Sequence, residues 1–162
     1  MARSDAAFVL ALVNEPSFIR HIGDRNIRNV EAAADYIDNG PWTRPGDPGI
    51  GLRVVELRDG DEAIGICGLL KRDTLDAPDI GFAFLPAHWS RGYAMEAASA
   101  VLRHGLGELG HRRILAIVSP GNAASIRLLE KLGLCRERVA RLAEGAAEVA
   151  IYSTPSDTIP AS

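Results

Sequence analysis

The run Asp79-Ile-Gly-Phe-Ala-Phe-Leu85, followed by the turn Trp89-Ser-Arg-Gly-Tyr-Ala94, carries the strongest structural signal in this chain. The first segment is apolar almost throughout, as expected for a strand buried on both faces. The second segment predicts a glycine turn that opens a helix reaching about Leu109. A turn of this kind gathers free backbone N–H groups and the positive end of a helix dipole at one point. It therefore predicts a site for a pyrophosphate group.

A second strand and a second helix follow the first pair. The segment 113–118 is apolar after its first residue and predicts another strand, and the segment 122–133 predicts a helix. Asn122 is expected to be the N-cap of that helix, with Ser125 as its partner at position N3. A strand, a helix and a strand in this order predict a parallel pair joined by a right-handed crossover.

Shorter strands flank the crossover on both sides. The segments 52–58 and 63–71 predict a hairpin that turns at Asp59-Gly60, and the segments 134–142 and 148–152 predict a second one. The fold class is therefore α/β, with a mixed and mostly antiparallel sheet around one parallel crossover.

The N-terminal third predicts helices and loops. Asp5 is expected to cap a helix over 6–13, and Asn29 a helix over 30–37. The segment between them, 14–29, is expected to be irregular, and 41–49 is expected to form a loop because it holds three prolines.

Composition limits the class of protein. The chain has 162 residues, 47% hydrophobic and 24% charged, with a formal net charge of -3. These values predict one domain over residues 1–153 with a flexible tail over 154–162, and they argue against a nucleic-acid-binding protein. Cys67 and Cys135 have no metal-ligand spacing, so no metal site is predicted. The absence of a leader-like or membrane-length apolar run predicts a cytoplasmic protein that does not bind membranes.

The order of these segments resembles the GNAT superfamily of acetyl-CoA-dependent N-acetyltransferases. The signature of that family is Gln/Arg-x-x-Gly-x-Gly/Ala, and here Gly92 and Ala94 fit while Trp89 stands at the first position. The Trp-x-x-Gly-Tyr-Ala-x-Glu variant over 89–96 resembles the branch of the RimJ and RimL ribosomal-protein acetyltransferases. The Asn-x-x-Ser run at 122–125 and the Glu-Lys-x-Gly run at 130–133 match that branch too.

The resemblance implies acetyl-CoA as the acyl-donor cosubstrate. It implies that the two crossover strands splay apart, and that the pantetheine arm pairs with the backbone in that gap. It also implies that the segment containing His21 lines the acceptor channel. The cofactor-binding residues implied in this way are Phe82, Ala83, Phe84, Ser90, Arg91, Gly92, Tyr93, Ala94, Met95, Asn122 and Ser125.

Two residues are candidates for catalysis. The resemblance places Ser125 near the cofactor sulfur, where its hydroxyl would assist the departing thiolate, and Asp79 where some relatives carry a base. The Glu and Tyr used by other branches are replaced here by Ile117 and Leu129. A water chain, or deprotonation of the amine before it binds, remains an alternative to a base on the protein.

The predicted activity is acetyl transfer to a primary amine by direct attack in a ternary complex. The acceptor is not identified by the sequence; the α-amino group of a protein is one candidate. The alternatives are an acetyltransferase for a small molecule such as an aminoglycoside or polyamine, and a non-catalytic acyl-CoA-binding module. The family's first strand is missing or very short here, so a sheet edge would be exposed, which predicts a homodimer unless a loop or helix covers that edge.

Overall fold

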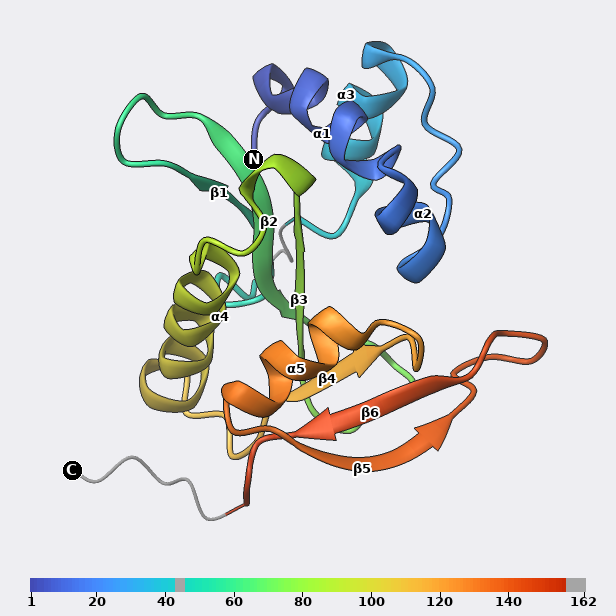
Figure 1. Ribbon diagram of the computed structural model, residues 1–162, viewed down its shortest axis with the longest axis vertical. Coiled ribbons are helices and arrows are strands. Elements are labelled where there is room, and N and C mark those ends of the chain that lie inside the picture. Colours follow the sequence, from blue (N-terminus) through green and yellow to red (C-terminus); the bar gives the residue numbers. More distant parts are fainter. Residues whose placement is uncertain (43–45, 157–162) are drawn as a thin grey trace.

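The computed structural model describes residues 1–42 and 46–156, and its centre is a six-stranded sheet (Figure 1). The strand order is β1-β2-β3-β4-β6-β5. Only β3 and β4 pair in parallel among these strands, and every other neighbouring pair is antiparallel. The predicted mixed sheet with one parallel crossover is confirmed. The strands are β1 Gly51–Glu56, β2 Ala63–Leu70, β3 Asp79–Phe84, β4 Leu115–Val118, β5 Cys135–Ala140 and β6 Val149–Ser153.

The helices cover both faces of the sheet. They are α1 Ala6–Val13, α2 Pro16–His21, α3 Val30–Asn39, α4 Tyr93–Arg103 and α5 Ala123–Lys131, with a π-helical turn at His104–Glu108 that extends α4. Ile66 of β2 packs with α1 and α3, whereas its neighbour Cys67 packs with α4 and α5 on the other face. This division follows from the two-residue period of a strand. None of the helices within the described ranges is long and apolar enough to cross a bilayer.

The N-terminal segment differs from its prediction in two places. Asp5 precedes α1 as expected but does not cap it, because its carboxylate accepts a hydrogen bond from the Ala2 N–H at 2.7 Å. The segment 14–29 is not wholly irregular, since it contains α2, which begins at Pro16. Proline favours the first turn of a helix, where its missing N–H has no cost, so Pro16 was the signal for this helix. The cap at Asn29 is confirmed: its side chain accepts from the Ala32 N–H at 2.8 Å.

The edge of the sheet at β1 is partly covered by the preceding loop. Within the described residues no strand precedes α1, and β1 is the outer strand, as the sequence predicted. One of its backbone amides, Leu52 N–H, donates to the Pro41 carbonyl at 3.0 Å. The alternative to a second copy is a covering of this edge by the first helix and the loop 41–49. This hydrogen bond is one contact of that kind, and residues 43–45 of the loop lie outside the described ranges. The homodimer stays a prediction.

The last strand holds the chain beyond the predicted domain boundary. Thr154 is buried, its N–H donates to the Ile114 carbonyl at 3.0 Å, and its hydroxyl oxygen accepts from the Ile114 N–H at 3.0 Å. The predicted tail begins at this residue, and its part over 157–162 lies outside the described residues.

We predict that Gly68→Ala destabilises the sheet. A Cβ atom at Gly68 would overlap the backbone carbonyl oxygen of Gly51 on the neighbouring strand, and neither strand can shift without breaking the ladder. We expect a loss of about 1–3 kcal/mol in the free energy of unfolding, as for other overpacked positions, measured by urea denaturation. Gly107→Ala is the control, because a Cβ there meets nothing within 4 Å. Equal stability of the two variants would contradict the prediction.

Candidate active site

The two central strands separate soon after they meet. β3 and β4 pair only at Asp79 with Leu115 and at Ile80 with Ala116. β3 then continues to Phe84 while staying paired with β2 on its other side. From Gly81 onward, the β3 edge that faces β4 has no strand partner. A row of backbone N–H and C=O groups is therefore available to a ligand that lies between the strands.

The turn after β3 is built for an anion. Ser90 and Gly92 both have left-handed backbones, with φ of 59° and 83°. Gly92 is the N-cap of α4, and no side chain caps this helix. A Cβ at Gly92 would meet nothing within 4 Å, so glycine is required here for its dihedral angle and not for space. The uncapped N–H groups of the first turn of α4 can bind a phosphate.

Trp89 closes the base of this turn. Its indole N–H donates to the Phe84 carbonyl at 2.8 Å, which joins the turn to the end of β3. Trp89 as a residue remains 49% exposed. The residue that departs from the GNAT signature thus fixes the turn against the strand and presents an aromatic surface.

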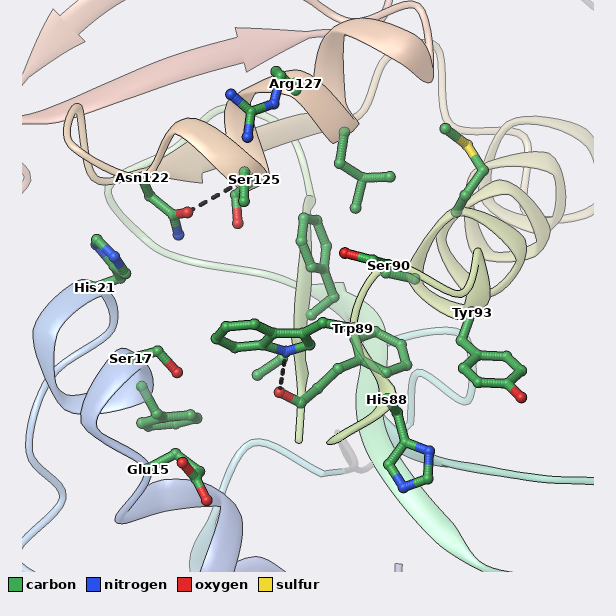
Figure 2. A pocket seen from close by; sticks show the side chains of 18 of the residues that line it. Glu15, Ser17, His21, His88, Trp89, Ser90, Tyr93, Asn122, Ser125 and Arg127 are labelled. Atoms are coloured by element: carbon green, nitrogen blue, oxygen red, sulfur yellow. Dashed lines mark hydrogen bonds between the residues drawn. The ribbon is translucent and has the colours of Figure 1, made fainter. Parts of the chain in front are cut away.

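A cavity of about 550 Å³ connects these features (Figure 2). One wall is β3 and the turn, a second is α5, and a third is formed by the end of α1 and by α2. Of the residues predicted to bind the cofactor, all but Arg91 line this cavity. Arg91 is exposed beside the turn.

Asn122 and Ser125 have different roles at the start of α5. The Asn122 side-chain oxygen accepts from the Ser125 N–H at 3.2 Å, so Asn122 caps the helix as predicted. The Ser125 hydroxyl makes no hydrogen bond to any residue in the described ranges, although it lines the cavity. Ser125 therefore contributes only its backbone to the cap, and its side chain is available to a ligand.

Asp79 does not line the cavity that contains Ser125. It begins β3, about 16 Å along the strand from Phe84 at the usual rise per residue. It is 1% exposed, and its carboxylate pairs with the Arg72 side chain at 3.0 and 3.2 Å. Burial raises the pKa of Asp79, while the charge of Arg72 opposes that shift. The structure does not bring the two predicted catalytic residues together.

Several lining residues were not singled out by the sequence. Glu15 and Ser17 belong to the α2 region, which was expected to be irregular, and Arg127 and Lys131 belong to α5. Arg127 and Lys131 are four residues apart and therefore lie on the same face of the helix that Asn122 caps. His21 also lines the cavity, and its Nδ1 atom is buried without a hydrogen-bond partner among residues 1–42 and 46–156.

His88 joins the hairpin of β1 and β2 to the turn. Its Nε2 atom lies 3.3 Å from the Glu62 carboxylate, and its ring centroid lies 6.2 Å from that of Tyr93. Its Nδ1 atom is buried and has no hydrogen-bond partner in the part of the chain that the structure describes. The hairpin tip, which the sequence shows as a run of charges, therefore packs against the candidate site through one of its carboxylates.

Comparison with known proteins defines the class. Residues 1–134 match the model of the acetyltransferase (GNAT) domain. The uncharacterized N-acetyltransferase YoaA of Bacillus subtilis is 34% identical over 85% of this chain and 77% of its own length. YkkB of the same organism is 29% identical over 82% of this chain and 76% of its own length. The chain belongs to the GNAT acetyltransferase family, and it is an N-acetyltransferase.

Solved structures share the fold. A GNAT-family acetyltransferase from Bacillus anthracis superimposes with a TM-score of 0.78 at 23% identity, covering 97% of this chain and 92% of the other. A spermidine N-acetyltransferase SpeG chimera from Vibrio cholerae and hSSAT gives 0.75 at 16% identity, covering 98% and 94%. At these identities the likeness concerns the fold alone.

We predict that Asp79→Asn changes stability and not catalysis. Because burial raises the pKa of Asp79, ionisation disfavours the folded state, and stability falls as pH rises from 3.8 through the raised pKa. The asparagine variant lacks this loss, so urea titrations should show its stability relative to the native protein rising as the pH increases from 3.8 through the raised pKa. The ratio kcat/KM should stay within about twofold; a fall of about 10²–10⁴-fold would identify a general base.

Proposed function

We propose that this protein transfers the acetyl group of acetyl-CoA to a primary amine that attacks the thioester directly in a ternary complex. The observation that carries the proposal is one continuous cavity. It runs from the phosphate-type turn, along the unpaired edge of β3, to the α2 wall. A donor and an acceptor bound in the same cavity can react without a covalent intermediate on the protein, and holding them together supplies much of the rate.

The residues present fit coenzyme A. Its pyrophosphate suits the start of α4, where no side chain caps the backbone N–H groups. The residues that line the cavity there are Ser90, Gly92, Tyr93, Ala94 and Met95. The pantetheine amides of the cofactor suit the open edge of β3 at Phe82, Ala83 and Phe84. Arg91 beside the turn, and Arg127 and Lys131 on α5, supply positive charge for its phosphates.

The chemistry requires few groups. A neutral amine attacks the thioester carbon, the carbon–sulfur bond breaks, and the thiolate takes up a proton. We assign the Ser125 hydroxyl to donate to that sulfur, since it lines the cavity without a protein partner. Asn122 keeps its amide NH₂ for the cofactor arm, because only its oxygen is used by the cap. Water or the medium takes the amine proton, since Asp79 lies outside the cavity.

The class of amine that is acetylated, and the branch of the GNAT family, have weaker support than the acetyl donor. The RimJ/RimL-type motifs support a protein α-amino group, whereas a closed, charged acceptor wall would support a small amine. A non-catalytic acyl-CoA-binding module is the remaining alternative. Leu129, at the position of the family's tyrosine, is 1% exposed and belongs to the core, so it offers no acid. An acetyl-CoA turnover screen against amines and N-terminal peptides, read by thiol release, separates these cases. If coenzyme A binds but no amine is acetylated, the proposed acetyltransferase activity is contradicted.

We predict that the charge at position 92 controls coenzyme A binding. Asp and Asn have nearly the same shape and both tolerate a left-handed backbone better than other side chains. Gly92→Asp places an anion at the phosphate site and should abolish binding in calorimetry, whereas Gly92→Asn should only weaken it. Equal affinities of two folded variants would show that the phosphates lie elsewhere.

We predict that substitution of Ser125 lowers activity, whereas substitution of Asn122 lowers stability. Ser125→Ala should lower kcat by up to about 10²–10³-fold, as expected for loss of one donor to developing charge. Its unfolding free energy should stay within about 0.5 kcal/mol, since the side chain makes no cap bond. Asn122→Ala removes the cap and should cost about 1 kcal/mol. A destabilised Ser125→Ala protein with native kcat would reverse the assignment.

A further inference from the structure

The carboxylate of Glu15 has no partner among the residues that the structure describes. Glu15 stands at the N-cap of α2, but its side chain makes no capping bond. The residue is half-buried and lines the cavity, and its carboxylate makes no hydrogen bond or ion pair within the described ranges. A half-buried carboxylate that faces a cavity without a counter-charge is stabilised by a cation that enters from solution.

Charge is segregated across the cavity. Glu15 is the only carboxylate among its described lining residues, and it lies on the α2 wall. The cationic side chains Arg127 and Lys131 lie on the α5 wall, where an anionic cofactor is expected. The two walls therefore suit ligands of opposite sign, which keeps a cationic acceptor apart from the positive side chains that attract the phosphates.

The position of Glu15 excludes the reacting nitrogen as its partner. Glu15, Ser17 and His21 form a row along α2, and His21 is the member next to Asn122 (Figure 2). Glu15 and His21 are about 9 Å apart along the helix at 1.5 Å per residue. The thioester is expected near Ser125, at the His21 end. A charge held by Glu15 is thus a second charge, several bonds away from the amine that is acetylated.

Trp89 lines the same cavity to one side of this row (Figure 2). The residue is 49% exposed, and its indole N–H is bonded to the Phe84 carbonyl, which holds the orientation of the ring. Figure 2 shows the ring between the α2 row and the start of α5. A fixed aromatic face suits an aliphatic chain and attracts an ammonium group.

We propose that Glu15 and Trp89 select an acceptor that is a small aliphatic amine with a second positive charge. This inference rests on the proposed acetyl transfer. The reacting nitrogen lies at the His21 and Ser125 end, the carbon chain lies along Trp89, and the distal ammonium pairs with Glu15. A peptide N-terminus with neutral side chains has no second charge for this carboxylate. Glu15 is a specificity residue and takes no part in the bond changes.

The test compares 1,4-diaminobutane with n-pentylamine, which replaces one ammonium by a methyl group. Calorimetry on the coenzyme A complex should show at least about tenfold tighter binding of the diamine, as for a charge pair that is partly shielded from water. The ratio of kcat/KM for the two amines should favour the diamine by a similar factor. Glu15→Gln should bring both ratios close to one. Glu31→Gln, an exposed carboxylate on α3 outside the cavity, is the matched control and should leave them unchanged.

The role of the ring has its own pair of variants. Both Trp89→Phe and Trp89→Leu lose the indole N–H, but only the phenylalanine keeps an aromatic face, so diamine affinity should fall further in the leucine variant. Equal affinity of the native complex for the two amines would overturn the inference. If n-pentylamine or a neutral peptide is acetylated at the same rate as the diamine, the inferred specificity is overturned, but the proposed acetyl transfer still holds. Selective diamine binding without transfer to any amine would support this site and contradict the proposed function.

Discussion

The candidate site depends on the separation of β3 and β4 after only two paired positions. A sheet normally satisfies its backbone groups through continuous ladders, yet these strands pair at only two positions. The firm antiparallel ladder to β2 holds β3 in place, so its other edge can stay open without loss of the strand. Because the two strands separate, the turn that follows β3 and the helix α5 that follows β4 both line one cavity. A ligand that pairs with the open edge completes the sheet.

The turn and the cofactor wall rely on backbone geometry more than on side chains. Ser90 and Gly92 adopt left-handed conformations, and the indole of Trp89 anchors the turn on the Phe84 carbonyl. A tryptophan at the first position of the family signature brings a large fixed ring to the cavity, where the family's usual Gln or Arg would bring a polar chain. The deviation from the signature therefore places an indole ring, instead of a polar side chain, against the cavity.

Side-chain roles were harder to assign than elements. Asn122 was correctly expected to cap α5, because an N-cap is a local property of a few neighbouring residues. Asp79 was a candidate base from its place at a strand start, but the structure shows it buried against Arg72, at the far end of β3 from the cavity. Whether a strand-end carboxylate faces a ligand or an arginine depends on contacts that a single strand pattern does not contain.

The sheet class, the crossover, the glycine turn and the capped helix could all be predicted from the sequence, because each rests on short-range patterns of apolar period, turn residues and caps. Pro16 is the local signal for α2, although the segment around it lacks a clear apolar period. The place of α2 as the third wall of the cavity, with Glu15 and His21 across from α5, becomes visible only in the folded chain. The two helices are about a hundred positions apart along the chain, and packing of the α1–α3 layer on β1 and β2 brings them together.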